Sequence, residues 1–427
     1  VEILPASGSA MYGANSVGGV INFVLRKNFT GSEASAYVGA AQGGAEETRV
    51  NLFHGFNFNQ GRSNLTLNLE YHRQNDLDSS ERPYYRRALE APALQGPSPG
   101  FTTVIVPYFL SRRPTVVTTS AAGLGISSDP AAFYAAVPAG SNGVGLTRDS
   151  FVANTAQLSE DRLARQELVS DSASHGALVT FEHEVSGERL GAYAELAWRK
   201  STYSSTYPYG SNSVSLAATS PLNPFRTDAA SGFVGRAITV YRAREEFPDA
   251  AQATDRGTRR AVAGLKGKWR TEGGRPFGWS LDISWDRSET DSLERASTWT
   301  GSIAAAANAG LYNVFRDLTG AAPLAESEAN KFRVDQRYLR TPTIAAGNLR
   351  FNGELFQVRD MPVLFSVGAE RREETGEVLT EFPYIGEYNY LPGGAAPLQV
   401  THSRTNRDVN AAYEEVIVPV VGAANPL

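Results

Sequence analysis

The stretch from Ser63 to Arg73 reads Ser-Asn-Leu-Thr-Leu-Asn-Leu-Glu-Tyr-His-Arg. Apolar side chains occupy alternate positions from Leu65 to Tyr71, and polar side chains occupy the positions between them. Because successive side chains of a β-strand point to opposite faces of the sheet, this stretch predicts a strand with one apolar and one polar face. The same alternation recurs at 190–199, 261–270, 279–286 and 363–370.

The connections between the expected strands alternate in length. We expect strands at 33–41, 46–58, 63–73, 175–185, 189–203, 258–270, 277–289, 346–357, 362–373 and 407–418. Short turns join them at one end, and the long excursions at the other end are 74–174, 204–257, 290–345 and 374–406. Only the first hairpin, through 42–45, breaks this rule with a short connection at the other end. Long structureless loops are uncommon in compact soluble domains, whereas transmembrane barrels combine short periplasmic turns with long extracellular loops. The pattern therefore favours an all-β transmembrane barrel over a soluble sandwich.

A lipid environment would also require the sheet to close. A membrane-spanning strand needs about 9–11 residues, which the expected strands supply. An open sheet edge in hydrocarbon would leave backbone groups unpaired, so we expect a barrel. Aromatic residues near the strand ends fit the girdles that mark the membrane interfaces, although strands are enriched in aromatics in any case. These residues are Tyr71, Trp198, Tyr203, Trp269, Trp279 and Trp285.

The composition of the 427-residue chain excludes several classes of protein. The chain contains no cysteine, which rules out disulfide scaffolds, thiolate zinc sites and cysteine nucleophiles. A mean hydropathy of -0.29, without any long uncharged apolar run, argues against membrane-spanning helices. A net charge of -5 argues against a nucleic-acid partner.

No catalytic or metal-binding motif is visible in the sequence. The five histidines show no His-Glu-x-x-His spacing, and neither a Gly-x-Ser-x-Gly elbow nor a phosphate loop occurs. Adjacent carboxylates such as Glu46 and Glu47 face opposite sides of a strand, so they do not converge as an acid–base pair. We therefore expect no catalytic residue, no metal site, no cofactor and no enzymatic activity. His54 falls on the apolar face expected for 46–58, where a histidine is unusual.

The first residues do not follow the barrel pattern. Val1 to Leu4 predicts a short strand, and Val20 to Arg26 predicts a second one. Between them, Ser9 to Tyr12 can form one helical turn that Gly13 ends. Small residues in this turn region permit close backbone packing. We expect a small α/β element directly before the barrel strands.

This segment resembles the end of the plug domain of TonB-dependent outer-membrane receptors. The family pattern is a Val-Glu-Val-Leu strand, a Leu-Tyr-Gly turn, a Gly-Gly-Val-Ile-Asn strand and a closing basic residue. The matching stretches here are Val1 to Leu4, Met11-Tyr12-Gly13, Gly18 to Asn22 and Lys27. The plug-motif residues are therefore Tyr12, Gly13, Gly18, Gly19 and Asn22. Where the family usually has a basic-Gly-Pro stretch after the first strand, this chain has Pro5-Ala6-Ser7.

The resemblance implies that residues 1–30 are the C-terminal end of a plug and residues 31–427 the N-terminal part of a transmembrane barrel. Plugged outer-membrane transporters have roughly 22 strands, so the expected strands would form part of such a barrel. We expect the chain to be a fragment that lacks the signal peptide and the box that contacts TonB. Alone, it is expected to form a curved open sheet, with 33–41 and 407–418 at the edges and residues 1–27 near the concave side.

The resemblance further implies energy-coupled uptake of a scarce ligand across the outer membrane of a Gram-negative bacterium. The implied partners are the inner-membrane TonB complex, outer-membrane lipid, lipopolysaccharide and a small ligand, which could be a siderophore, cobalamin, an oligosaccharide or a peptide. Aromatic and arginine side chains in the loops are favoured in recognition. The candidate ligand-binding residues are Tyr84, Tyr85, Arg86, Tyr108, Tyr207, Tyr209 and Arg242. Alternatively, these aromatics fold the long loops on themselves, and the arginines meet anionic lipopolysaccharide.

Two other functions stay open at this point. One is a passive pore or structural barrel closed from these strands alone, for which a plug-like segment has no purpose. The other is an outer-membrane enzyme or adhesin, which needs a convergent catalytic cluster or a repetitive exposed surface, and neither is visible.

Overall fold

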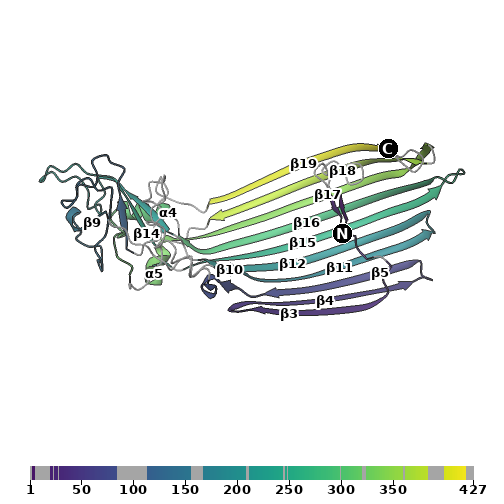
Figure 1. Cartoon of the computed structure of the whole chain (residues 1–427), viewed down its shortest axis with the longest axis horizontal. Coiled ribbons are helices and arrows are strands. Elements are labelled where there is room, and N and C mark those ends of the chain that lie inside the picture. The colour runs from purple at the N-terminus through teal and green to yellow at the C-terminus, as the bar shows by residue number, and fades with distance from the viewer. Residues whose placement is uncertain are drawn as a thin grey trace.

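One long antiparallel sheet dominates the fold (Figure 1). The computed structural model describes the chain except residues 1, 5–19, 23, 27, 84–112, 155–166, 208–210, 244–245, 248, 299, 320–323, 359–360, 383–398 and 420–427. The sheet has ten strands in the order β3-β4-β5-β11-β12-β15-β16-β17-β18-β19. Their bounds are β3 Gly31–Ala41, β4 Gly44–Phe58, β5 Ser63–Gln74, β11 Asp171–Ser186, β12 Leu190–Tyr207, β15 Ala250–Arg270, β16 Pro276–Thr298, β17 Arg333–Val358, β18 Met361–Phe382 and β19 Gln399–Ile417.

Each strand overlaps one of the ranges expected from the sequence, and the fold class is confirmed. The expected boundaries were wrong at the long-loop ends, where the strands run much further. β16 is 23 residues long and β17 is 26 residues long, so both enter the range 290–345 that was expected to be a loop. The apolar–polar alternation ends where a strand leaves an apolar environment, but backbone pairing continues beyond that point. The sequence pattern therefore marks the amphipathic part of each strand and not its whole length.

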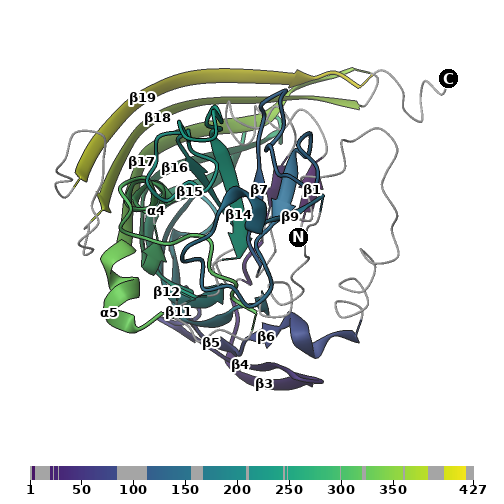
Figure 2. The same cartoon turned by 90° about the vertical axis from the view of Figure 1, so that its left-hand side faces the viewer.

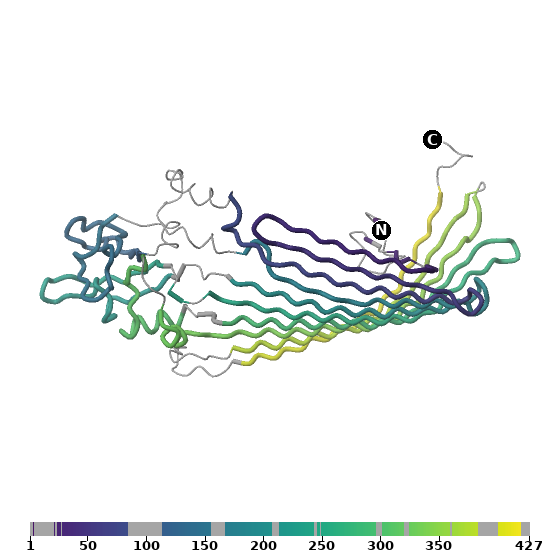
Figure 3. The backbone as a smooth tube through the Cα atoms, turned by 90° about the horizontal axis from the view of Figure 1, so that it is seen from below, coloured from purple at the N-terminus to yellow at the C-terminus, as the bar shows by residue number. Residues whose placement is uncertain are grey.

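The sheet curves into an open arc (Figure 2). β3 and β19 lie at its two ends and do not pair with each other, as expected for ten strands alone. The short strands β1 (Glu2–Leu4) and β2 (Val20–Asn22) form a separate antiparallel pair. Figures 2 and 3 place this pair of short strands inside the arc, on the concave side of the sheet. This position agrees with the plug-like element expected there, although the division into two domains at residue 30 stays a prediction.

A second, smaller sheet stands at the long-loop end of the main sheet (Figure 1). Its strand order is β13-β14-β7-β8-β9. The strands are β7 Thr115–Val117, β8 Tyr134–Ala136, β9 Val152–Ala153, β13 Ser211–Leu216 and β14 Ile238–Ala243. Helices α4 (Thr300–Asn308) and α5 (Glu326–Ala329) and the 3₁₀ turns η3 (Arg148–Ser150) and η4 (Asn330–Phe332) belong to the same body. We call the described residues of 114–154, 211–249 and 300–332 the loop lobe.

The hydrophobic core of the described residues lies in the loop lobe and not in the main sheet. Its larger members are Val116, Leu124, Phe151, Leu216, Phe225, Val240, Phe247, Ile303, Phe315 and Phe332. These residues come from long connections that are far apart in the sequence, so the connections fold together into one packed body.

At the rim between the lobe and the main sheet, β6 (Leu77–Asp78) pairs with β10 (Glu167–Val169), and η1 (Ser79–Glu81) follows β6. None of the helices in the described ranges is long and apolar enough to cross a membrane.

Candidate functional site

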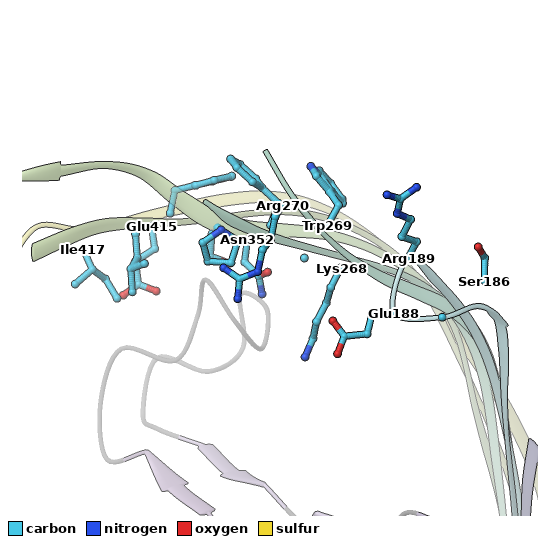
Figure 4. A pocket seen from close by; sticks show the side chains of 17 residues that line it. Ser186, Glu188, Arg189, Lys268, Trp269, Arg270, Asn352, Glu415 and Ile417 are labelled. Carbon is cyan, nitrogen blue, oxygen red and sulfur yellow. The ribbon is translucent and has the colours of Figure 1, made fainter. Parts of the chain in front are cut away.

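The two faces of the main sheet differ in polarity. Trp269 and Lys268 are neighbours on β15 and point to opposite sides of the sheet, Lys268 toward the concave side (Figure 4). The alternation from Trp269 places Leu265 on the convex face, directly opposite Leu281 of β16. Leu281 in turn lies opposite Leu349 of β17. The apolar positions therefore form rows that cross from strand to strand on the convex face.

The convex face exposes large apolar side chains along its middle. Leu196 of β12 is 58% exposed, and Ile283 of β16 is 63% exposed. Other exposed members of this face are Leu69, Trp198, Leu265, Leu281, Trp285, Leu349 and Phe351. A broad apolar face in contact with water is unfavourable, whereas lipid hydrocarbon removes it from water without a second protein layer. The convex face is therefore suited to the lipid side of a membrane barrel.

The concave face carries a network of polar and charged side chains. Its ion pairs include Lys266–Glu182 at 2.7 Å, Arg199–Glu70 at 3.2 Å, Arg260–Asp286 at 3.3 Å and Arg372–Glu370 at 2.9 Å. The amide of Asn348 donates a hydrogen bond of 2.9 Å to the carboxylate of Asp282 across β16 and β17. Such a wall suits the polar interior of an outer-membrane barrel.

A cavity of about 740 Å³ lies on the concave side near the short-turn ends of the strands. Basic side chains of Lys266, Lys268 and Arg350 line it together with the acidic Glu182 and Glu184. A larger cavity of about 1050 Å³ adjoins it, and Figure 4 shows the side chains that line this one. Since charges of both signs face the smaller cavity, it suits solvent or a polar protein segment better than a single ion. No group of three or more acidic or histidine side chains in the described residues could hold a metal ion.

The histidine that looked misplaced in the sequence lies where the alternation puts it. His54 is opposite Ser32 of β3 and Leu67 of β5, so it shares the convex face with Leu67. Its Nδ1 lies 2.8 Å from the hydroxyl oxygen of Ser32, and its ring lies 5.9 Å from that of Phe56. His54 lies near the end of β4 at Phe58. There its hydrogen bond and its ring contact accommodate a polar side chain on an apolar face.

The plug-motif residues are only partly within the described structure. Asn22 lies at the end of β2 and pairs with Glu2 of β1, while Ile3 pairs with Ile21. These pairings agree with two short plug-type strands. The remaining plug-motif residues, Tyr12, Gly13, Gly18 and Gly19, and the helical turn expected at 9–12 lie outside the described residues.

The structure describes only two of the candidate ligand-binding residues, Tyr207 and Arg242. Tyr84, Tyr85, Arg86, Tyr108 and Tyr209 lie outside the described residues. Tyr207 ends β12, where its backbone pairs with Ala250 of β15. Arg242 lies on β14 inside the loop lobe and is only 2% exposed. Its contacts are therefore with the lobe itself, and its role in ligand binding stays a prediction.

Arg242 forms an ion pair with Glu246, and the hydroxyl of Tyr312 donates a hydrogen bond to the same carboxylate. The guanidinium carbon of Arg242 lies 5.6 Å from the centre of the Tyr312 ring. Burial alone lowers the pKa of Arg242, but the neighbouring Glu246 and Tyr312 outweigh it, so that the pKa is raised. The guanidinium is therefore permanently charged and held by two long connections at once.

An aromatic side chain between two arginines was not singled out as a binding residue from the sequence. The ring of Phe233 lies 4.4 Å from the guanidinium carbon of Arg148 and 5.1 Å from that of Arg236. The adjacent Val234 is 68% exposed. Arginine and aromatic side chains in this arrangement are favoured in recognition surfaces. The sequence could not indicate this contact because Arg148 and Phe233 belong to different connections, far apart in the chain.

Among the comparisons with known proteins, the search of solved structures found similar chains. Neither a protein-family model nor a curated protein matches the chain. Among solved structures, the chain is similar to the ferric-catecholate import receptor Fiu from E. coli K12 in its open form, with a TM-score of 0.40 and 13% sequence identity. The similarity covers 97% of this chain and 56% of the receptor chain. The chain therefore spans about half the length of that receptor chain.

Proposed function

We propose that the chain forms part of the wall and plug of an outer-membrane receptor that takes up a scarce ligand by energy coupling through a TonB complex. The observation that carries this proposal is the contrast between the faces of the main sheet. Its convex face exposes residues such as Leu196 and Ile283, and its concave face carries ion pairs such as Lys266–Glu182. A lipid-facing outer surface and a polar interior are the properties that a barrel wall needs.

The edges of the sheet support the same placement. β3 and β19 each present an unpaired row of backbone groups among the described strands. Each unpaired group in hydrocarbon would cost several kcal/mol, so insertion requires both edges to find partner strands. The proposal therefore predicts that the arc is completed into a closed barrel when the protein is in a membrane.

The pair formed by β1 and β2 distinguishes a plugged receptor from a passive pore. It lies on the concave side of the arc (Figure 2), where it would occupy the interior of a closed barrel. A passive pore has no need of such an element. The loop lobe stands at the opposite end from the short turns and is suited to meet the ligand first, with Phe233 and its two arginines as one contact surface.

Uptake measurements in the producing cell test the proposal. Cells that make the protein should take up a labelled iron chelate, cobalamin or oligosaccharide faster than cells that lack it. Disruption of the TonB complex should abolish that difference, because the plug opens only when it is pulled. Uptake that needs the protein but not the TonB complex would identify a passive pore instead. The absence of the protein from outer-membrane fractions would contradict both the energy-coupled receptor and the passive pore.

A further inference from the structure

A row of basic side chains borders the apolar band of the convex face at its long-loop side. On β12, β15 and β16, the first convex-facing position beyond the apolar residues is Lys200, Arg259 and Arg287, respectively. All three side chains are exposed. On the same face, the next position inward is Trp198 on β12 and Trp285 on β16.

The strand register brings these three cations together. Arg259 lies directly opposite Arg287, and Trp198 lies opposite Arg259 on the other side. Lys200 is opposite Gly257, two residues from Arg259, which places Lys200 and Arg259 at a diagonal separation of about 7–8 Å. Like charges directly opposite each other destabilise a sheet, so this arrangement needs a compensating anion.

The described residues supply too little negative charge for that compensation. None of the three cations forms an ion pair within the described part of the chain. The acidic side chains nearest the cations on the convex face are Glu289, which lies opposite Gly257, and Asp255, which is diagonal to Lys200. Two carboxylates beside three cations still leave an excess of positive charge. Arg73, which also borders the apolar band, is by contrast paired with Asp171 at 2.5 Å.

The position of the cluster indicates what kind of anion could meet it. Tryptophan residues are enriched at the level of lipid headgroups, so Trp198 and Trp285 mark that level on the convex face. From Phe277 to Trp285, β16 covers the roughly 9–11 residues that a strand needs to span the hydrocarbon. Lys200, Arg259 and Arg287 therefore lie at the headgroups of the leaflet on the long-loop side. Arginine matches the geometry of phosphate oxygens with paired N–H donors.

We propose that Lys200, Arg259 and Arg287 form a binding site for the phosphate groups of an anionic glycolipid of the outer leaflet, a lipopolysaccharide. The site is on the outer wall of the barrel, remote from the interior and from the loop lobe. This inference rests on the membrane placement proposed above and names the residues that hold one of its lipid partners. The apolar row below the cations, which includes Leu196 and Ile283, packs against the acyl chains of the same lipid.

The test compares the double variant Arg259→Gln/Arg287→Gln with the single variant Arg260→Gln. Arg260 is the neighbour of Arg259 on β15, but it pairs with Asp286 on the concave face and serves as a matched control. The protein is purified from outer membranes in mild detergent, and the lipopolysaccharide that remains bound is measured by mass spectrometry. Binding is then measured again in nanodiscs that contain purified lipopolysaccharide, lipopolysaccharide stripped of its phosphates, or phosphatidylcholine alone.

We expect the double variant to retain about tenfold less lipopolysaccharide than the unmodified protein, and Arg260→Gln to retain as much as the unmodified protein. We also expect removal of the lipid phosphates to abolish the difference between the proteins. Equal retention by the double variant, while it still fractionates with the outer membrane, would overturn the site but leave the proposed function intact. Failure of the unmodified protein to fractionate with the outer membrane would instead overturn the proposed function.

Discussion

Arg242 and Glu246 form an ion pair in the interior of the loop lobe, where each side chain is only 2% exposed. Tyr312, which shares the carboxylate, comes from the connection after β16, whereas Arg242 and Glu246 come from the connection after β12. The pair therefore ties two long connections into one body. A buried pair is expensive to desolvate, and losing one partner leaves the other charge unpaired in the core.

The first prediction follows from this pair. Arg242→Met should destabilise the loop lobe by about 3–5 kcal/mol, because Glu246 is then left buried without its cation. Hydrogen–deuterium exchange of lobe peptides in the whole chain measures the effect. Arg226→Met is the control, since the exposed side chain of Arg226 donates a hydrogen bond only to the carbonyl of Pro221 among the described residues. The double variant Arg242→Met/Glu246→Leu should recover most of the loss, and a single variant without effect would show that the pair does not hold the lobe together.

The main sheet could be predicted from the sequence because the pattern that indicates each strand lies within a few consecutive residues. The alternation from Leu65 to Tyr71 is one example, and the short turns between strands indicate which strands are neighbours. The ends of β16 and β17 could not be predicted, because beyond the apolar band both faces meet water and the alternation disappears. The order of the ten strands follows from their order in the chain, which is why no distant pairing had to be guessed.

The loop lobe could not be predicted, because its contacts join residues that are distant in the sequence. Phe225 packs on Phe151 at a ring separation of 5.0 Å, and Phe151 packs on Phe315 at 5.9 Å. These residues belong to separate connections and follow no common period. The same enrichment in aromatics that suggested ligand contact therefore also fits the alternative of loops folded on themselves, which is what the described part of the lobe shows. For Arg242, composition alone could not distinguish a surface cation from a buried one.

The second prediction concerns the two faces of the main sheet. Leu281→Arg should destabilise the protein in a bilayer by about 2–4 kcal/mol, because the new charge lies in the hydrocarbon. Ser284→Arg on the same strand is the matched control, since Ser284 faces the concave side opposite Val262 and Ala346. Folding into lipid vesicles at increasing urea concentration measures both. Similar losses for the two variants would contradict the assignment of the convex face to lipid.

The third prediction is a pH dependence in the loop lobe. The carboxylate of Asp149 accepts a hydrogen bond of 2.7 Å from the backbone N–H of Ser127, and the hydrogen bonds from Ser127 hold the pKa of Asp149 below its usual value. A lowered pKa in the folded state contributes stability above the ordinary aspartate pKa and loses it as the pH falls through the lowered value. Protection of the Ser127 amide from exchange should therefore decrease in acid, below about pH 4. In the variant Asp149→Asn this loss of protection in acid should not occur. If the loss were the same as in the unmodified protein, another titrating group would be its cause.

The last prediction tests a close approach of backbone that only glycine permits. Gly267 of β15 lies opposite Trp279, and a Cβ atom at Gly267 would overlap the backbone carbonyl oxygen of Arg189 as well as the indole ring. Gly257 on the same strand has no atom within 4 Å of its Cβ position. Gly267→Ala should therefore cost about 1–3 kcal/mol by overpacking, since a carbonyl held in a turn cannot move aside as a flexible side chain can. Gly257→Ala should be neutral or slightly stabilising, because alanine restricts the unfolded chain. Both variants are compared by thermal unfolding in detergent, and a neutral Gly267→Ala would mean that the turn at 186–189 is free to move away from β15.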